Sequence, residues 1–157
     1  MTAPELQSPG SGQWREGMHA FRVRVYYEDT DAGGIVYHAN YLNFAERART
    51  EMLRLIGAEQ DEMRRKTGLG FTVRRCEIDF RAPARLDDLL EIRTLPREAR
   101  GARVLAVQSL HHVIDGTVDP EWIVQLDLTL ACVNEMGRPT RLPEPIRAAF
   151  AAASQTQ

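Results

Sequence analysis

The chain has 157 residues, of which 43% are hydrophobic, and a formal net charge of -2 at pH 7. This length and apolar content suit one domain built around one core. The slightly negative charge argues against a nucleic-acid-binding protein. No apolar run is long enough to span a bilayer, and residues 1–17 have neither the basic nor the apolar region of a secretory signal. These features predict a cytoplasmic protein without a transmembrane segment.

The N-terminal segment is predicted to differ from the rest of the chain. Residues 1–17 are rich in Pro, Gly, Ser and Gln, so we expect a disordered tail before a single domain over residues 18–153. Trp14 is the one residue of this tail expected to pack onto the domain.

Cys76 and Cys132 have no CxxC partner and are expected to be buried free thiols, which agrees with a reducing cytoplasm.

One long helix is predicted in the first third of the chain. Residues 20–27 alternate between apolar and polar side chains, which predicts a half-buried strand before this helix. The helix is expected to run from His38 to about Gly57, where a glycine favours a helix stop. Residues 58–68 follow as a short second helix or a loop. The apolar positions of the long helix recur at helical spacing and are expected to face the core: Tyr41, Ala45, Ala48, Met52 and Leu55.

The remainder of the chain predicts long antiparallel strands. They are expected at residues 71–80, 86–96, 102–114 and 121–133. A turn is expected at 97–101, a hairpin at Asp115 and Gly116, and a short terminal helix over 145–153. One long helix against such strands is an α+β arrangement, and strands longer than about 5–6 residues favour a curled sheet. We therefore expect the sheet to wrap around the helix.

The candidate chemistry lies in the segment before the helix. Asp31 sits in an exposed turn followed by Gly33 and Gly34, and the helix is expected to begin at His38. The unpaired N–H groups of a helix start favour developing negative charge, and a nearby carboxylate acts either as base or as nucleophile. Together they would provide half of an acyl-transfer site. The two glycines permit unusual turn angles or let a substrate approach bare backbone, and both interpretations stay open.

Other kinds of site are not supported by the sequence. HExxH, CxxC and carboxylate clusters are absent, so no metal is expected. No GxGxxG or Walker string indicates a nucleotide cofactor, and no GxSxG elbow indicates a serine hydrolase. The adjacent His111 and His112 would point to opposite faces of a strand. The residues alone therefore favour neither a metal site nor a Rossmann, P-loop or serine-hydrolase site.

Three strings of the sequence carry a family resemblance: DTDAGGIVYHANYLNFAERARTEML, RAPARLDDLLEI and CVNEMGRPTRLPEPI. Over about residues 21–150 they resemble the 4-hydroxybenzoyl-CoA thioesterase branch of the hotdog fold, and within it the YbgC-type acyl-CoA thioesterases linked to the Tol–Pal envelope system. The resemblance implies a hotdog fold and homodimers that join two sheets edge to edge. Such dimers often pair into homotetramers and have their active sites at the dimer seam. The resemblance also implies hydrolysis of acyl-CoA without a metal or an organic cofactor.

The resemblance assigns catalytic roles to individual residues. The family's catalytic acid corresponds to Asp31, and the N–H that polarises the thioester carbonyl corresponds to that of His38. We favour this main-chain role of His38 over a role for its imidazole. Glu46 is a second acidic candidate, because another hotdog branch uses a helix glutamate. The alternative for Glu46 is a surface ion pair with Arg49, three residues further along the helix.

The residues expected to contact substrate fall into two groups. Beside the catalytic turn and its glycines, Tyr37 is expected to pack, and Asn40 to cap the helix and help order the site. Basic side chains are expected at the mouth of a CoA pocket: Arg81, Arg138 and Arg141. The expected substrate is a short-chain or aromatic acyl-CoA. An acyl group carried by acyl carrier protein, or binding of acyl-CoA without catalysis, stays open as an alternative.

Overall fold

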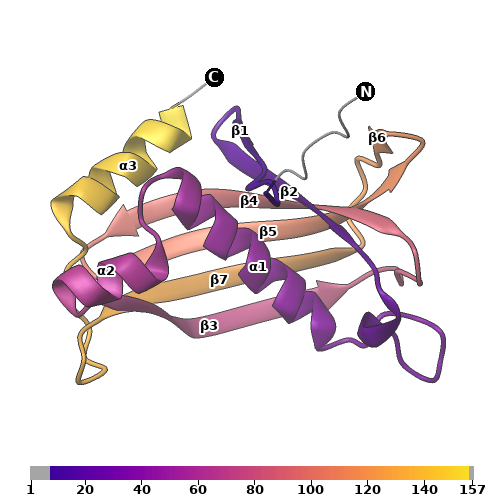
Figure 1. Cartoon of the computed structure of the whole chain (residues 1–157), viewed down its shortest axis with the longest axis horizontal. Helices are drawn as coiled ribbons and strands as arrows, with labels where there is room; N and C mark the ends of the chain where they lie inside the picture. The colour runs from indigo at the N-terminus through magenta and orange to yellow at the C-terminus, as the bar shows by residue number, and fades with distance from the viewer. Residues whose placement is uncertain (1–7, 156–157) are drawn as a thin grey trace, which may run out of the picture.

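The structure, a computed structural model, describes residues 8–155. Figure 1 shows one long helix lying across one face of a sheet, with two shorter helices gathered near its C-terminal end. The helices and strands, in chain order, are β1 Gln13–Arg15, β2 Met18–Arg24, the 3-10 helix η1 Tyr27–Asp29, α1 Asn40–Leu55, α2 Gln60–Thr67, β3 Gly70–Phe80, β4 Leu89–Arg100, β5 Arg103–Ile114, β6 Thr117–Val118, β7 Val124–Val133 and α3 Glu144–Gln155.

The strands form one antiparallel sheet in the order β1-β2-β4-β5-β7-β3, and β6 pairs with β5. Three strands have 11 or 12 residues, which is about twice the usual strand length and favours a curled sheet. The sheet curls around α1 (Figure 1), which confirms the predicted α+β hotdog arrangement. Within the described residues, β3 has β7 as its only neighbour, so its other edge is open.

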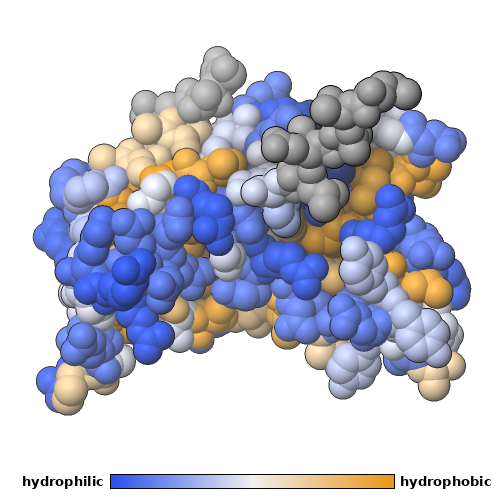
Figure 2. Space-filling view, in the orientation of Figure 1, coloured by the Kyte–Doolittle hydropathy of each residue, from blue (hydrophilic) through white to orange (hydrophobic). Residues whose placement is uncertain are grey.

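The core lies between α1 and the concave face of the sheet. Ala45, Ala48 and Met52 are buried there, as their helical spacing predicts. Leu55 is instead 45% exposed, so its prediction as a core residue was wrong. It is the last residue of α1, and the core contacts at this end are made instead by Leu53 and Ala58. Figure 2 shows hydrophilic side chains over the outward surfaces of α1 and α2, as expected for helices with one buried face.

A second apolar cluster fills the space under the C-terminal half of α1. It joins this half of α1 to β5, β7 and α3, and its members include Met52, Leu53, Val104, Leu130, Cys132, Leu142 and Phe150. Trp14 packs against this cluster, as predicted. Cys76 and Cys132 are both free thiols, but only Cys132 is fully buried, because Cys76 lies on the edge strand β3.

The N-terminal boundaries differ from the predicted ones. The first long strand is β2, Met18–Arg24, rather than 20–27, because the chain turns into η1 at Tyr27, which is 83% exposed. Part of the predicted tail is ordered, since β1 pairs with β2. Residues 1–7 lie outside the described residues.

The predicted turn at 97–101 was wrong in its position. β4 continues to Arg100 by means of an irregularity in its pairing with β5 between Pro96 and Glu98. Such a bulge tolerates a proline, which cannot donate a ladder hydrogen bond. The hairpin at Asp115 and Gly116 is confirmed, with positive φ angles of 52° and 79°.

In the part of the chain that the structure describes, no helix is long and apolar enough to span a membrane.

Candidate active site

Residues 26–40 form a tight loop that leads into α1. Asp29 is its buried anchor, with 8% of its surface exposed. One of its carboxylate oxygens accepts the Tyr26 N–H at 2.7 Å, and the other accepts Nδ2 of Asn40 at 2.7 Å. The Asp29 carbonyl also accepts the Tyr37 N–H at 2.9 Å. These bonds fasten both ends of the loop to the first residue of the helix.

The turn after β3 holds the same loop from the sheet side. Ala84 is fully buried, and its carbonyl accepts the Val36 N–H at 2.8 Å. The Ala84 N–H donates to the Tyr41 hydroxyl at 3.0 Å. Burial raises the pKa of Tyr41, although this hydrogen bond opposes the shift. The Tyr41 phenol is therefore neutral at physiological pH and serves as a structural acceptor.

Asp31 lies in the exposed part of this loop. Its main chain is fixed on both sides, since its N–H donates to the Ile35 carbonyl and its carbonyl accepts the Gly34 N–H, both at 3.0 Å. Its carboxylate oxygen Oδ1 accepts the Gly33 N–H at 2.8 Å. No protein donor within residues 8–155 reaches the other oxygen, Oδ2. The carboxylate is thus held in one orientation and keeps a free oxygen that faces solvent.

His38 occupies the approach to α1, two residues before the helix begins. Its ring contacts Tyr37, with centroids 4.6 Å apart, and Phe80 at the end of β3, with centroids 6.2 Å apart. Among the described residues, no acceptor is found for the main-chain N–H of His38 or of Ala39. These two amides lie at the positive end of the helix dipole. They are therefore available to a carbonyl oxygen of a bound substrate.

The other predicted site residues in this loop have different structural roles. Gly34 has a φ of +80°, so the turn requires a glycine there. A side chain at Gly33 would come within 3.1 Å of the Asp31 carboxylate, so this glycine leaves room beside the acid. Tyr37 is 49% exposed and flanks the loop. The predicted capping role of Asn40 was wrong, because the N-cap is Ala39 and the Asn40 side chain binds Asp29 instead.

Glu46 forms an ion pair with Arg49, one turn further along α1. The Glu46 side chain is 53% exposed, whereas the Arg49 side chain is only 8% exposed. Arg49 also donates to Oε1 of Gln108 at 2.7 Å, and Gln108 in turn donates to Thr94 and to the Ala45 carbonyl. A buried guanidinium therefore lies between α1 and the sheet. No contact joins Glu46 to Asp31, although both are described.

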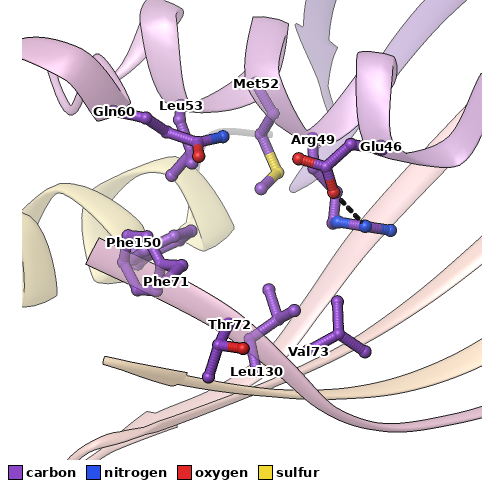
Figure 3. A pocket seen from close by; sticks show the side chains of 10 residues that line it. All are labelled: Glu46, Arg49, Met52, Leu53, Gln60, Phe71, Thr72, Val73, Leu130 and Phe150. Carbon is purple, nitrogen blue, oxygen red and sulfur yellow. Dashed lines mark hydrogen bonds and ion pairs between the residues drawn. The ribbon is translucent and has the colours of Figure 1, made fainter. Parts of the chain in front are cut away.

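A pocket opens between α1 and β3, and we refer to it as the α1–β3 pocket (Figure 3). Its polar side consists of the Glu46–Arg49 pair, and its far end is closed by Phe150 of α3. The void inside it measures about 30 Å³. The remaining walls are largely apolar and include Met52, Leu53, Phe71, Val73 and Leu130.

The three predicted basic residues lie at two separate places. Arg81 directly follows Phe80, stacks over Trp122 at 5.2 Å and reaches Glu121 at 3.9 Å, near the start of α1. Arg138 and Arg141 lie in the loop after β7. β7 begins opposite Phe80 and ends opposite Gly70, so its 10 residues separate the two places by roughly 30 Å. One chain alone therefore does not bring all three arginines to Asp31.

The comparisons with known proteins agree with this geometry. The family model of the thioesterase-like superfamily matches residues 25–150. The chain belongs to this superfamily.

Two relatives of this thioesterase-like chain cover nearly its whole domain. It is 42% identical over 133 residues to the acyl-CoA thioesterase YbgC of Haemophilus influenzae, which covers 83% of this chain and 93% of that protein. It is 41% identical over 129 residues to the acyl-CoA thioester hydrolase YbgC of Escherichia coli, with coverage of 82% and 92%. A probable thioesterase structure from Bartonella henselae is 40% identical, has a TM-score of 0.72, and covers 80% of this chain and 99% of that one.

Two residues that shape this thioesterase-like site were not anticipated from the sequence. Nothing in the sequence separates Asp29 from the other acids of this segment, yet it is the buried acid that fixes the loop to α1. Ala84 carries no chemical signal at all, and its role comes from main-chain bonds to residues more than 40 positions away.

No cluster of three or more His, Cys, Asp or Glu side chains suited to a metal is found across residues 8–155.

Proposed function

We propose that the protein is an acyl-CoA thioesterase whose catalytic unit is the domain of residues 18–153. The observation that carries the proposal is the loop before α1. Counting only partners within residues 8–155, it leaves one oxygen of the Asp31 carboxylate free and, a few residues later, the N–H groups of His38 and Ala39 without acceptors. A carboxylate and N–H donors for the carbonyl oxygen are what thioester hydrolysis requires. The names of the YbgC relatives support the same substrate class.

The reaction follows from these two elements. The thioester carbonyl oxygen accepts the His38 and Ala39 N–H groups, so the negative charge that develops on it is stabilised at the helix start. Asp31 either takes a proton from water as the water adds to the carbonyl carbon, or adds to that carbon itself and forms an anhydride that water then opens. In both routes the carbon–sulfur bond breaks. The thiolate leaves as CoA and takes up a proton.

The site is completed, we propose, by a second copy of the chain paired along the open edge of β3. Arg75 and Glu77 flank Cys76 on this edge, and both are exposed. Arg75 and Glu77 form an ion pair with each other within the chain. A two-fold axis at Cys76 would set Arg75 of each copy opposite Glu77 of the other, so the same four charges would also attract one another across the two strands. The same axis brings the β7 end of the partner, with Arg138 and Arg141 of the partner subunit, toward the Arg81 end of the first copy. The three arginines then surround one site and suit the CoA phosphates.

The free thiols Cys76 and Cys132 support a cytoplasmic location for this enzyme. Aliphatic, aromatic and carrier-protein thioesters remain to be ranked as substrates. Release of thiol from matched acyl-CoA and acyl carrier protein substrates, measured side by side, ranks them directly.

The mechanism is tested with Asp31→Asn, because the amide keeps the shape of the carboxylate but cannot act as a base. We expect kcat for acyl-CoA hydrolysis, followed by thiol release, to fall by about 100-fold or more. Glu28→Gln is the matched control, since Glu28 is an exposed carboxylate in the same loop, and it should retain activity. Circular dichroism and sedimentation should give the same fold and assembly for all three proteins. Undiminished turnover by the Asp31→Asn enzyme would remove Asp31 from the mechanism. Tight binding of acyl-CoA without thiol release by the wild type would make the protein a binding module instead.

A further inference from the structure

The chain folds back on itself before β2, and we refer to residues 8–15 as the N-terminal strap. The three residues of β1 pair with β2 across a tight turn, in which Glu16 and Gly17 both have positive φ angles, of 50° and 75°. Figure 1 shows β1 beside the C-terminal half of α1. A hairpin this short is barely stable in water by itself. The strap therefore depends on the contacts that its side chains make with the domain.

Three contacts hold the N-terminal strap against the domain. The Ser11 hydroxyl donates to the Glu51 carboxylate of α1 at 2.7 Å, and the Ser11 carbonyl accepts Nε2 of His19 at 2.7 Å. Trp14 packs against the second apolar cluster and lies edge-on to the His19 ring, with centroids 5.7 Å apart. Two of the three contacts thus involve His19, which joins the strap to the sheet.

His19 is fully buried, and the strap presents two uncharged groups to it, the Ser11 carbonyl and the Trp14 indole. A carbonyl oxygen only accepts hydrogen bonds, so the neutral ring carries its proton on Nε2 and leaves Nδ1 bare. Among residues 8–155, Nδ1 has no hydrogen-bond partner. A second proton on the ring would create a buried N–H without an acceptor, because the indole N–H of Trp14 can only donate.

The other groups around His19 compensate poorly for a positive charge. Thr94 of β4 and Phe21 of β2 are neutral. On α1 the facing charge is Glu51, whose carboxylate already accepts two hydrogen bonds, one of them from Nε of Arg54 at 3.1 Å. Burial lowers the pKa of His19, and the main-chain bond to the strap and the attraction to Glu51 offset only part of this shift. Protonation therefore favours a state in which the ring reaches water.

We infer that the N-terminal strap is a pH-sensitive latch, closed while His19 is neutral and released when His19 is protonated. Release swings the strap about the turn at Glu16 and Gly17, breaks both bonds of Ser11 and brings the imidazolium to solvent. Trp14 leaves the second apolar cluster, so part of this cluster becomes exposed together with the outer edge of β2. The main core between α1 and the sheet keeps its contacts, because no strap residue belongs to it.

Protonation of His19 sets the direction and the steepness of the release. The open strap leaves this ring in water with its ordinary pKa of 6.5, whereas the closed strap keeps the pKa lower, so the open state binds more protons as the pH falls. The closed strap is fully favoured above about pH 6.5. Below this pH, the ratio of closed to open strap should fall by about tenfold for each pH unit, until the pH reaches the lowered pKa of the closed state.

The latch is tested by following Trp14. The chain has two tryptophans, so Trp122→Phe leaves Trp14 as the only one and makes its fluorescence report on the strap. Between about pH 7.5 and about pH 5, its emission should shift to longer wavelength, and its quenching by acrylamide should rise by about twofold or more. Binding of the apolar dye anilinonaphthalene sulfonate should rise over the same range. Far-UV circular dichroism should stay unchanged, since the domain itself remains folded.

Three variants in the Trp122→Phe background identify the group that titrates. His19→Gln keeps a donor toward the strap but does not titrate, so its strap should stay closed over the whole range. Gly12→Ala should open the strap at every pH, because φ is +79° there and a Cβ atom would lie 2.2 Å from the Ala20 carbonyl oxygen. His111→Gln is the matched control and should keep the transition, since His111 is likewise buried but lies on the opposite face of the sheet.

A change in Trp14 emission that persists in His19→Gln would overturn the latch, as would constant emission in the chain that keeps His19. Loss of far-UV circular dichroism over the same pH range would also overturn it, because the transition would then be global unfolding. If His19→Gln is already open at about pH 7.5, trypsin cleavage after the exposed Arg15 decides, with each rate divided by that of Gly12→Ala at the same pH. With His19 present this ratio should rise by about tenfold per pH unit below about pH 6.5, and a constant ratio would refute the latch.

Discussion

The hydrogen bond between Asn40 and Asp29 offers a quantitative test of how the catalytic loop is held. Asp29 is 8% exposed and its carboxylate accepts two donors, the Tyr26 N–H and Nδ2 of Asn40, each at 2.7 Å. A hydrogen bond to a charged group contributes about 1.5–3 kcal/mol net to stability. Asn40→Ala should therefore lower the free energy of unfolding by about 1.5–3 kcal/mol. Asp29→Ala removes both bonds and should lower it by roughly 3–6 kcal/mol.

The interaction is isolated with a double-mutant cycle in urea unfolding, followed by circular dichroism. The coupling energy between Asn40→Ala and Asp29→Ala should be about 1.5–3 kcal/mol, since the two changes share one bond. Asn43→Ala is the matched control, because it removes an exposed bond to Asn40 on the same turn of α1 and should change stability by less than about 1 kcal/mol. A coupling energy below about 0.5 kcal/mol would refute the view that this pair anchors the loop.

The cycle also has a catalytic readout. Asn40 does not touch the carbonyl site in this arrangement, so its loss acts only through the position of the loop that carries Asp31. We expect Asn40→Ala to lower kcat more than it raises KM, and the two single variants to lower kcat to similar extents. A normal kcat in a destabilised Asn40→Ala enzyme would mean that the loop is ordered by other contacts.

Further outcomes follow from burial and backbone geometry. Burial lowers the folded-state pKa of His19 and His111 below the ordinary 6.5, so the unfolded chain protonates first as pH falls. The contribution of these neutral histidines to the free energy of unfolding should be fully present above about pH 6.5 and should decrease below it. A free energy of unfolding that stays constant between pH 7 and pH 5 in urea titrations would contradict this. Gly57→Ala should destabilise the protein by about 1–2 kcal/mol, because φ is +75° there, and an unchanged melting temperature would argue against a left-handed helix end. Leu126→Ala should lower the free energy of unfolding by about 2–5 kcal/mol, whereas exposed Leu55→Ala should change it by under about 0.5 kcal/mol; equal effects would contradict the burial of these side chains.

Much of the fold could be predicted because periodicity is a local signal. The burial of Ala45, Ala48 and Met52 followed from helical spacing alone, and the strand expected at 121–133 contains β7, Val124–Val133. The errors occurred where tertiary contacts override local preference. β4 passes through the turn predicted at 97–101, because its bulge and its pairing with β5 keep the chain in the strand as far as Arg100.

The sequence supplied candidates for the reactive groups, which stay a prediction, but it did not supply the contacts that support them. Asp31 and His38 stand out because acid, glycines and helix start are consecutive in the sequence. The supports of the loop depend on contacts that no spacing rule reports, such as the bond from Ala84 to Tyr41. The sequence also predicted that three arginines line the mouth of one CoA pocket. Within a chain, however, the length of β7 separates Arg81 from Arg138 and Arg141.

The double attachment of Ala84 has a consequence for the order in which this protein matures. The Val36 amide and the Tyr41 hydroxyl find their partners only after the turn that follows β3 has docked. The reactive loop therefore acquires its shape late, when residues far apart along the polypeptide have already met. The exchange rate of the single Val36 amide proton in heavy water would report, without any substrate, whether a newly made molecule has reached its working form.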